Sequence, residues 1–270
     1  MSADPRPLTV LDLVAMKATG RRIVVLTCYD AVFARVLEQA EVDVLLVGDS
    51  LNQVLAGHET TLSTTLDQMI YHAAAVRRGS RRALVFVDLP FLTYQISIPD
   101  AIRNAGRVLQ ETGAHGVKLE GGSHMAATVT ALVERGIPVM GHLGLTPQSV
   151  HALGGYRVQG RDDKSAERLQ KDAKALEGAG ACSIVLELVP ADLAARISQS
   201  LTIPTIGIGA GPGCDGQVLV LHDMLGLNEQ FSPKFLKHYA HLAESVRQAV
   251  RCFAAEVREG KYPDKEHSFE

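Results

Sequence analysis

The stretch GVKLEGG, residues 116–122, has the form of a short buried strand that ends on a carboxylate, Glu120. Three further apolar runs of strand length end in the same way, namely VLLVGDS (44–50) at Asp49, ALVFVDLP (83–90) at Asp88 and CSIVLELVP (182–190) at Glu187. Short β-branched runs separated by helical stretches are typical of parallel strands in a βαβ series. If these strands close into a barrel, their carboxyl ends face one mouth. The pattern therefore predicts that four acids far apart in the sequence converge in one place.

The alternation of apolar runs and helical segments covers most of the chain. The strands that we predict lie at residues 23–28, 44–48, 84–88, 116–120, 138–142, 183–187, 204–209 and 217–222. We expect an N-terminal helix over about 9–19 and a long C-terminal helix over about 233–258. The predicted fold is thus an α/β (β/α)8 TIM barrel with these two additional helices. Because the chain shows no internal repeat and no linker, we expect residues 1–270 to form a single catalytic domain.

Several predicted helices carry start and stop signals. Thr65 and Gln68 have the spacing of a capping box, and the helix that they begin is expected to stop at Gly79. Pro99 and Gly113 mark the ends of a second helix. Ser123 and Gly136 mark the ends of a third.

Two connections are long, at residues 49–63 and 143–163. In the second, Thr146 and Pro147 predict a short helix, and its glycines leave two interpretations open: a mobile cover over the mouth or an ordered packing loop. The glycine run GIGAGPG (207–213) does not satisfy GxGxxG, which argues against a dinucleotide fold. Since no Lys or Arg lies between 207 and 220, we expect a tight turn there more than a phosphate site.

Composition excludes several classes of protein. The net charge is −3, which gives no global attraction to nucleic acid or to an anionic membrane. No apolar run reaches the roughly 18 residues of a membrane span. The four cysteines are widely spaced, so we expect reduced thiols, neither a zinc site nor a redox motif, and a cytoplasmic protein.

Each candidate acid also has a purely structural interpretation. An Asp after a strand often caps the next helix, although no helical pattern directly follows Asp49 or Asp88. Lys118 shares a strand side with Glu120, so these two side chains either neutralise each other or belong to a site. His142 ends the fifth strand and either donates to a developing oxyanion or binds a loop carbonyl. Clustered carboxylates repel unless a cation compensates them, and hard oxygen ligands favour Mg²⁺ over Zn²⁺.

The chain resembles the ketopantoate hydroxymethyltransferase family, which belongs with the phosphoenolpyruvate and pyruvate-type TIM barrels. The resemblance spans residues 23 to 269 and rests on the segments LTCYD (26–30), LLVGDSL (45–51), GHETTL (57–62), DLPF (88–91), VKLEGG (117–122), GHLGLTPQS (141–149), GGYRVQGR (154–161), LELVP (186–190), IGIGAG (206–211) and EHSF (266–269). It implies hydroxymethyl transfer from 5,10-methylenetetrahydrofolate to 3-methyl-2-oxobutanoate, giving ketopantoate for the synthesis of pantothenate and coenzyme A. It also implies a homo-oligomer, commonly a decamer.

The resemblance further implies a role for each site residue. Asp49 and Asp88 match magnesium ligands that, through the metal, also hold the substrate, and Glu120 matches a further ligand that acts directly or through water. Ser50 and Lys118 match substrate contacts, and His142 is a candidate for substrate binding and for assisting proton movement. Glu187 matches the catalytic base, which would form an enolate stabilised by Mg²⁺.

Two other functions stay open at the level of sequence. A Mg²⁺-dependent lyase or aldolase acting on another 2-oxoacid would use the same acids but would need no folate. A non-catalytic barrel would only bind an oxoacid or serve assembly. The second alternative is weaker, since a scaffold has no reason to gather acids and a lysine at one mouth.

Overall fold

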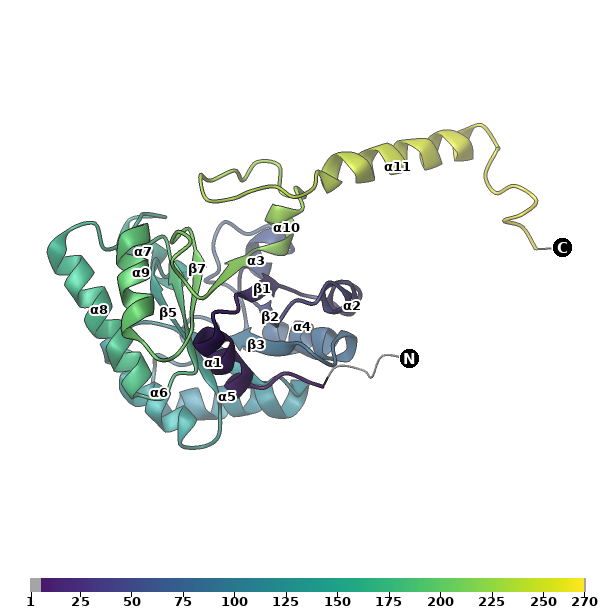
Figure 1. Ribbon diagram of the computed structural model, residues 1–270. Helices are drawn as coiled ribbons and strands as arrows, with labels where there is room; N and C mark the ends of the chain where they lie inside the picture. The colour runs from purple at the N-terminus through teal and green to yellow at the C-terminus, as the bar shows by residue number, and fades with distance from the viewer. Residues whose placement is uncertain (1–5, 270) are drawn as a thin grey trace. The chain divides into compact units, whose positions relative to one another are not determined.

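Eight parallel strands close into a barrel in sequence order, in a computed structural model that describes residues 6–269 (Figure 1). The pairing is parallel throughout, and β8 pairs with β1 to complete the circle. The strands are β1 Ile23–Thr27, β2 Val44–Val47, β3 Leu84–Asp88, β4 Gly116–Glu120, β5 Val139–Gly144, β6 Ser183–Glu187, β7 Thr205–Ile208 and β8 Gly216–Leu219. The predicted (β/α)8 fold is confirmed.

Helices follow most strands and lie around the barrel, as α4, α5, α6, α8 and α9 do in Figure 1. The helices within residues 10–200 are α1 Val10–Thr19, α2 Ala31–Gln39, α3 Leu51–Val54, α4 Leu66–Gly79, α5 Ile98–Thr112, α6 Ala126–Val133, α7 Val150–Leu153, α8 Asp163–Gly178 and α9 Ala191–Ser200, with 3₁₀ turns η1 Ser123–Met125 and η2 Pro147–Ser149. Across the described residues, none of the helices combines the length and the apolarity that crossing a membrane requires.

Two of the three pairs of helix signals work as expected, and the third, Ser123 and Gly136, does not, because the helix there is α6 Ala126–Val133. Thr65 and Gln68 form a complete capping box at the start of α4. In α5, Ser97 caps the first turn and Gly113 ends the helix with a left-handed φ of 70°, a conformation that glycine adopts without strain. The helix expected after Ser123 begins instead as the 3₁₀ turn η1 and continues as α6.

The chain divides into two compact units, Met1–Leu219 and Val220–Glu270. The prediction of a single domain stays a prediction. In the second unit, α10 spans Leu221–Met224 and α11 spans Leu242–Arg258. Two predicted boundaries were therefore wrong: the last strand stops at Leu219, and the long helix begins nine residues later than the expected 233. Residues between 233 and 242 bond backward, since Tyr239 N donates to Met224 O at 2.8 Å.

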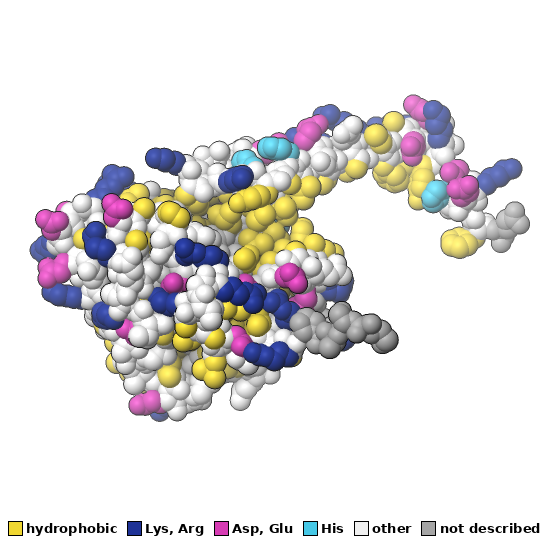
Figure 2. Space-filling view, in the orientation of Figure 1, with side chains coloured by type: hydrophobic (Ala, Val, Ile, Leu, Met, Phe, Trp, Pro, Cys, Tyr) yellow, Lys and Arg dark blue, Asp and Glu magenta, His cyan; other side chains and the backbone are white. Residues whose placement is uncertain are grey.

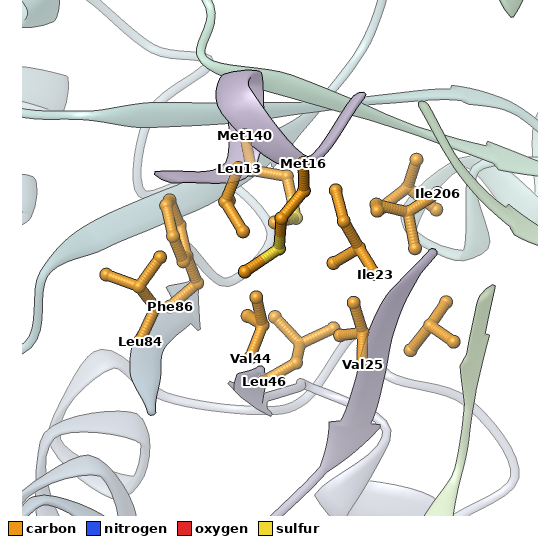
Figure 3. Packing of buried hydrophobic residues seen from close by; sticks show 12 residues of the cluster. Leu13, Met16, Ile23, Val25, Val44, Leu46, Leu84, Phe86, Met140 and Ile206 are labelled. Atoms are coloured by element: carbon orange, nitrogen blue, oxygen red, sulfur yellow. The ribbon is translucent and has the colours of Figure 1, made fainter. Parts of the chain in front are cut away.

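The barrel interior is apolar from its amino-terminal end to about its middle (Figure 3). Leu13 and Met16 of α1 point onto Ile23, Val44 and other side chains from the strands. Burying each such side chain contributes about 1.5–3 kcal/mol to the free energy of unfolding, so the packing of α1 stabilises the barrel. Because α1 closes the amino-terminal end, the polar residues at the strands' carboxyl ends face the open mouth.

Candidate active site

On the four strands β3 to β6, the inward side chains change from apolar or small to charged toward the carboxyl end. On β3 the inward series Leu84, Phe86 and Asp88 begins in the hydrophobic cluster and ends on a carboxylate. On β4 the charged inward positions are Lys118 and Glu120. Successive inward residues are two apart, so one strand supplies both the core and the site. This is the physical reason why the predicted acids converge.

Strand register sets which charged side chains are neighbours. Asp88 lies beside Lys118 in the β3–β4 pairing, and Glu120 lies beside His142 in the β4–β5 pairing. All four residues are buried. The convergence of Asp49, Asp88, Glu120 and Glu187 expected from the sequence is accordingly seen at one end of the barrel, although their chemical roles are a separate question.

Lys118 pairs with Asp88 and not with Glu120. Its ammonium nitrogen lies 2.7 Å from Asp88 Oδ1, and each side chain is only 5% exposed. Burial alone would lower the pKa of Lys118, but the charges of Asp88, Glu120 and Asp49 raise it above its ordinary value. A buried ion pair of this kind costs desolvation and is weak evidence for a purely stabilising role.

Asp49 does not cap a helix through its side chain. Its backbone N–H donates to Asp88 Oδ2 at 3.1 Å, and its own Oδ2 accepts from Gln148 Nε2 at 2.9 Å. Contrary to the sequence prediction, a helix does follow closely, since the one-turn helix α3 begins at Leu51. Burial, with the nearby charges of Asp88 and Glu120, raises the pKa of Asp49 well above its usual value.

His142 lies between two carboxylates, and its role toward a developing oxyanion stays a prediction. Its Nε2 is 3.1 Å from Glu187 Oε2, and its Nδ1 is 3.5 Å from Glu120 Oε1, with the geometry of ion pairs more than of directed hydrogen bonds. Burial and Lys118 lower the pKa of His142, but the two carboxylates outweigh them and raise it to about 9. His142 is thus placed to attract the carboxylates of both Glu187 and Glu120.

The backbone around Glu187 is unusual on both sides. Gly144 lies beside Glu187 in the β5–β6 pairing, and a Cβ there would come 2.1 Å from the Glu187 carbonyl oxygen. Leu188, the next residue along the chain, has a left-handed φ of 46°. Such a conformation costs a non-glycine residue about 1–3 kcal/mol and often occurs at functional sites. It turns the chain sharply just after Glu187, whose side chain is 16% exposed.

Three residues of the site were not assigned a role from the sequence, although two of them, Tyr29 and Gln148, lie in segments that carry the family resemblance. Gln148 reaches the acids from the loop after β5, and Tyr94 OH donates to Gln148 Oε1 at 2.7 Å. Tyr29 OH lies 2.9 Å from Ser50 Oγ, which places the predicted substrate contact Ser50 in a hydroxyl pair. Glutamine and tyrosine are common residues, so only the fold reveals these positions.

The two long connections meet through a side-chain contact. Gln53 Nε2, in the first connection, donates to Tyr156 OH in the second at 3.2 Å. The short helix predicted from Thr146 and Pro147 is present as η2, which continues into α7. Because Gln148 in this segment is buried and bonded to Asp49, its first half is a packing loop. Movement of the half that holds Tyr156 stays a prediction.

The donor set can be compared with the requirements of a divalent cation. Within residues 6–269, no three His, Cys, Asp or Glu side chains are already arranged as a metal-ligand group. However, the buried oxygens Asp88 Oδ1 and Glu120 Oε1 contact basic side chains, with Lys118 Nζ at 2.7 Å and His142 Nδ1 at 3.5 Å. Three buried carboxylates face one lysine, and hard oxygen donors are what Mg²⁺ prefers. The residues therefore fit such a cation chemically.

A closed barrel with acid, lysine and histidine side chains at the carboxyl ends of its strands defines an enzyme of the α/β-barrel class. The model of the ketopantoate hydroxymethyltransferase family matches residues 7–265, and the chain belongs to this family. The resemblance stated from the sequence is thus confirmed.

Relatives of similar length carry one enzyme name. The 3-methyl-2-oxobutanoate hydroxymethyltransferase of Syntrophus aciditrophicus (strain SB) is 54% identical over 264 residues, which cover 98% of this chain and 97% of that protein. The enzyme of the same name from Pelobacter propionicus (strain DSM 2379 / NBRC 103807 / OttBd1) is 54% identical over 269 residues, and both chains are covered completely. The one from Moorella thermoacetica (strain ATCC 39073 / JCM 9320) is 55% identical, with 97% of each chain covered.

Solved structures with lower identity share the fold. 2,3-Dimethylmalate lyase, a member of the PEP mutase/isocitrate lyase superfamily, has a TM-score of 0.60 at 19% identity, covering 98% of this chain and 93% of that one. Phosphonopyruvate hydrolase, in a complex with oxalate and Mg²⁺, has a TM-score of 0.63 at 13% identity, covering 97% and 92%. At these identities the likeness concerns the barrel alone.

Proposed function

We propose that this protein transfers a hydroxymethyl group from 5,10-methylenetetrahydrofolate to 3-methyl-2-oxobutanoate, giving 2-dehydropantoate (ketopantoate) on the way to pantothenate and coenzyme A. The family and the names of its relatives support this reaction. The observation that carries the proposal is Glu187, a partly exposed carboxylate held by His142 at 3.1 Å beside a buried cluster of acids. Because the Glu187 carboxylate lies next to the buried acids and is also partly exposed, it is suited to remove a proton from the carbon next to a carbonyl group.

The residues divide the chemistry between them. Glu187 accepts the proton from C3 of the oxoacid, which leaves the electron pair of that C–H bond on the substrate. The new carbon nucleophile bonds to the methylene carbon as one of the two bonds from that carbon to folate nitrogens breaks. Water then supplies the hydroxyl group as the second carbon–nitrogen bond breaks, and the two freed nitrogens of tetrahydrofolate take up the C3 proton and one proton of the water. Lys118 offsets the negative charge that gathers on the oxoacid. Ser50, at the same mouth, is proposed to contact the substrate.

Asp49, Asp88 and Glu120 are proposed to hold Mg²⁺, with Glu120 acting directly or through water. When bound, the cation would supply a Lewis acid that polarises the keto oxygen of the substrate. The burial of these three carboxylates, two of which contact Lys118 and His142, supports this assignment because their hard oxygens suit a divalent cation. Phosphonopyruvate hydrolase, which has the same fold, forms its complex with oxalate together with Mg²⁺, and this is consistent with the assignment.

Exchange at C3 in D₂O tests the proposed function. With Mg²⁺ and 3-methyl-2-oxobutanoate, we expect the protein to replace the C3 proton by deuterium in the absence of folate, as followed by NMR. EDTA should stop the exchange. Adding methylenetetrahydrofolate should then yield ketopantoate. Exchange without any ketopantoate would favour a Mg²⁺-dependent lyase or aldolase acting on another 2-oxoacid, and no exchange would contradict the proton transfer.

We also propose that the protein is a homo-oligomer. Within the second unit, α11 has no buried residue, and its apolar side chains Val246, Val250, Phe253 and Val257 recur at helical spacing with 47–58% exposure. Figure 2 shows hydrophobic side chains exposed along this helix. An apolar stripe of this kind is typical of an interface between chains. Light scattering should give the mass of a multiple of the 29.0 kDa chain, the family's decamer being one expected size. A monomer mass at micromolar concentration would contradict the proposal.

We propose a cytoplasmic location because the cysteines are not paired in disulfide bonds. Cys28, Cys182, Cys214 and Cys252 are all free thiols. Unpaired cysteines are typical of a reducing compartment. Recovery of the protein in a secreted or periplasmic fraction would contradict this location.

A further inference from the structure

Gln148 uses every hydrogen-bonding position of its side chain. Its Nε2 donates to Asp49 Oδ2 and to Leu89 O, both at 2.9 Å. Its Oε1 accepts from Tyr94 OH at 2.7 Å and from Gln95 Nε2 at 3.1 Å. An amide group has two donors and two acceptor positions, so this set is complete.

The surroundings permit only one orientation of the Gln148 amide. If the amide were turned over, Oε1 would face Asp49 Oδ2 and the carbonyl of Leu89, which are both acceptors. The Tyr94 hydroxyl could adapt by donating to Glu120 O at 3.4 Å, but the carbonyl of Leu89 cannot become a donor. Since Gln148 is only 5% exposed, water does not relieve such a mismatch. The N–H that meets Asp49 is therefore fixed by the Leu89 carbonyl.

The backbone of Gln148 holds a second acid. Its N–H donates to Glu120 Oε2 at 3.0 Å, and Glu120 Oε1 has no hydrogen-bond partner. One residue thus engages one oxygen of Asp49 and one oxygen of Glu120. Asp49 follows β2 and Glu120 ends β4, whereas Gln148 comes from the connection after β5. Through Gln148, the loop after β5 links two carboxylates, Asp49 and Glu120, that belong to different parts of the barrel.

We propose that Gln148 is a positioning residue that orients Asp49 and Glu120 so that their remaining oxygens face a bound divalent cation. This proposal rests on the proposed function only in its choice of cation. Residues that hydrogen-bond to metal ligands, and so orient them, contribute about 10–100-fold to metal affinity or activity. Gln148 acts through Asp49 and Glu120 and is not itself assigned a contact with substrate.

Binding of Mn²⁺ alone, measured by titration calorimetry on the full chain, tests this role. Gln148→Met keeps the length of the side chain but removes both amide donors, and we expect it to weaken Mn²⁺ binding about 10–100-fold. Gln159→Met is the matched control, because Gln159 lies in the same loop and its amide donates to Arg157 O. The control should change the dissociation constant less than about twofold. Gln148→Ala, which admits water, serves as the second variant if the Met variant does not fold.

The outcomes separate this inference from the function that it builds on. Equal Mn²⁺ affinity in folded Gln148→Met and wild type would overturn it, because a residue with a merely structural role changes thermal stability and not affinity. Absence of Mn²⁺ binding in the wild type would overturn it as well. If Gln148→Met weakens binding while the wild type makes no ketopantoate, the positioning role stands and the proposed reaction fails.

Discussion

Glu187→Gln is expected to slow deuterium exchange at C3 of 3-methyl-2-oxobutanoate by about 10²–10⁴-fold, the usual contribution of a positioned general base. Glutamine has nearly the same shape but does not accept a proton at neutral pH. The amide still meets His142 Nε2, which lies 3.1 Å from Glu187 Oε2 in the native protein, so the loop around it should stay in place. The measurement is the first-order loss of the C3 proton signal by NMR in D₂O with Mg²⁺.

The control for this variant is Glu134→Gln, the same substitution at an exposed position just after α6. It should exchange at the wild-type rate. Mn²⁺ affinity should be almost unchanged in Glu187→Gln, because Glu187 is not among the proposed ligands. An exchange rate that Glu187→Gln leaves intact would remove Glu187 as the base and direct attention to another proton acceptor at the mouth.

The positions of the strands could be predicted from the sequence because strands that are buried on both faces form nearly continuous apolar runs. The predicted strands at 84–88 and 116–120 agree with β3 and β4 to the residue. β3 is apolar until Asp88 ends the run, and β4 carries Lys118 two residues before Glu120 ends it. Convergence of the acids then follows from barrel closure, which the repeating β and α pattern already implied.

The pairing of the charges was not readable from one strand alone. Lys118 and Glu120 share a side of β4 and were candidates to neutralise each other. Residues two apart along a strand are separated by about 6.6 Å, whereas register partners on adjacent strands are about 4.8 Å apart. Lys118 therefore reaches Asp88 on β3 at 2.7 Å. Register is a property of the whole sheet, and a single strand does not encode it.

The contributions of the loops escaped prediction for a related reason. Gln148 and Asp49 are 99 residues apart, and nothing in the composition of TPQS marks its glutamine as a partner of a carboxylate. The predicted start of α11 was wrong. Residues after Pro233 have acceptable helix propensity, but their backbone N–H groups donate hydrogen bonds to residues 224 and 225 instead. Tertiary hydrogen bonds decide such segments, and local pattern does not.

Lys118→Met is expected to lower the free energy of unfolding by about 3–5 kcal/mol in the presence of EDTA, as measured by urea denaturation. The variant leaves Asp88 buried without its cationic partner, next to Asp49, whose backbone N–H is 3.1 Å from Asp88 Oδ2. Methionine fills most of the volume of the lysine stem, so the loss reflects charge more than packing. Saturating Mg²⁺ should return part of the stability, because a cation that binds only the folded state stabilises it.

Two further variants separate a buried charge effect from a general loss of a lysine. Lys171→Met removes an exposed lysine of α8 that pairs with Glu167 at 3.1 Å, with side chains 71% and 69% exposed, and should change stability by less than about 0.5 kcal/mol. The double variant Asp88→Asn/Lys118→Met removes both buried charges and should recover most of the loss, since it no longer leaves one charge uncompensated. If the double variant is as unstable as the sum of the two single ones, the Lys118 stem is needed for packing and the buried ion pair is not what stabilises this end of the barrel.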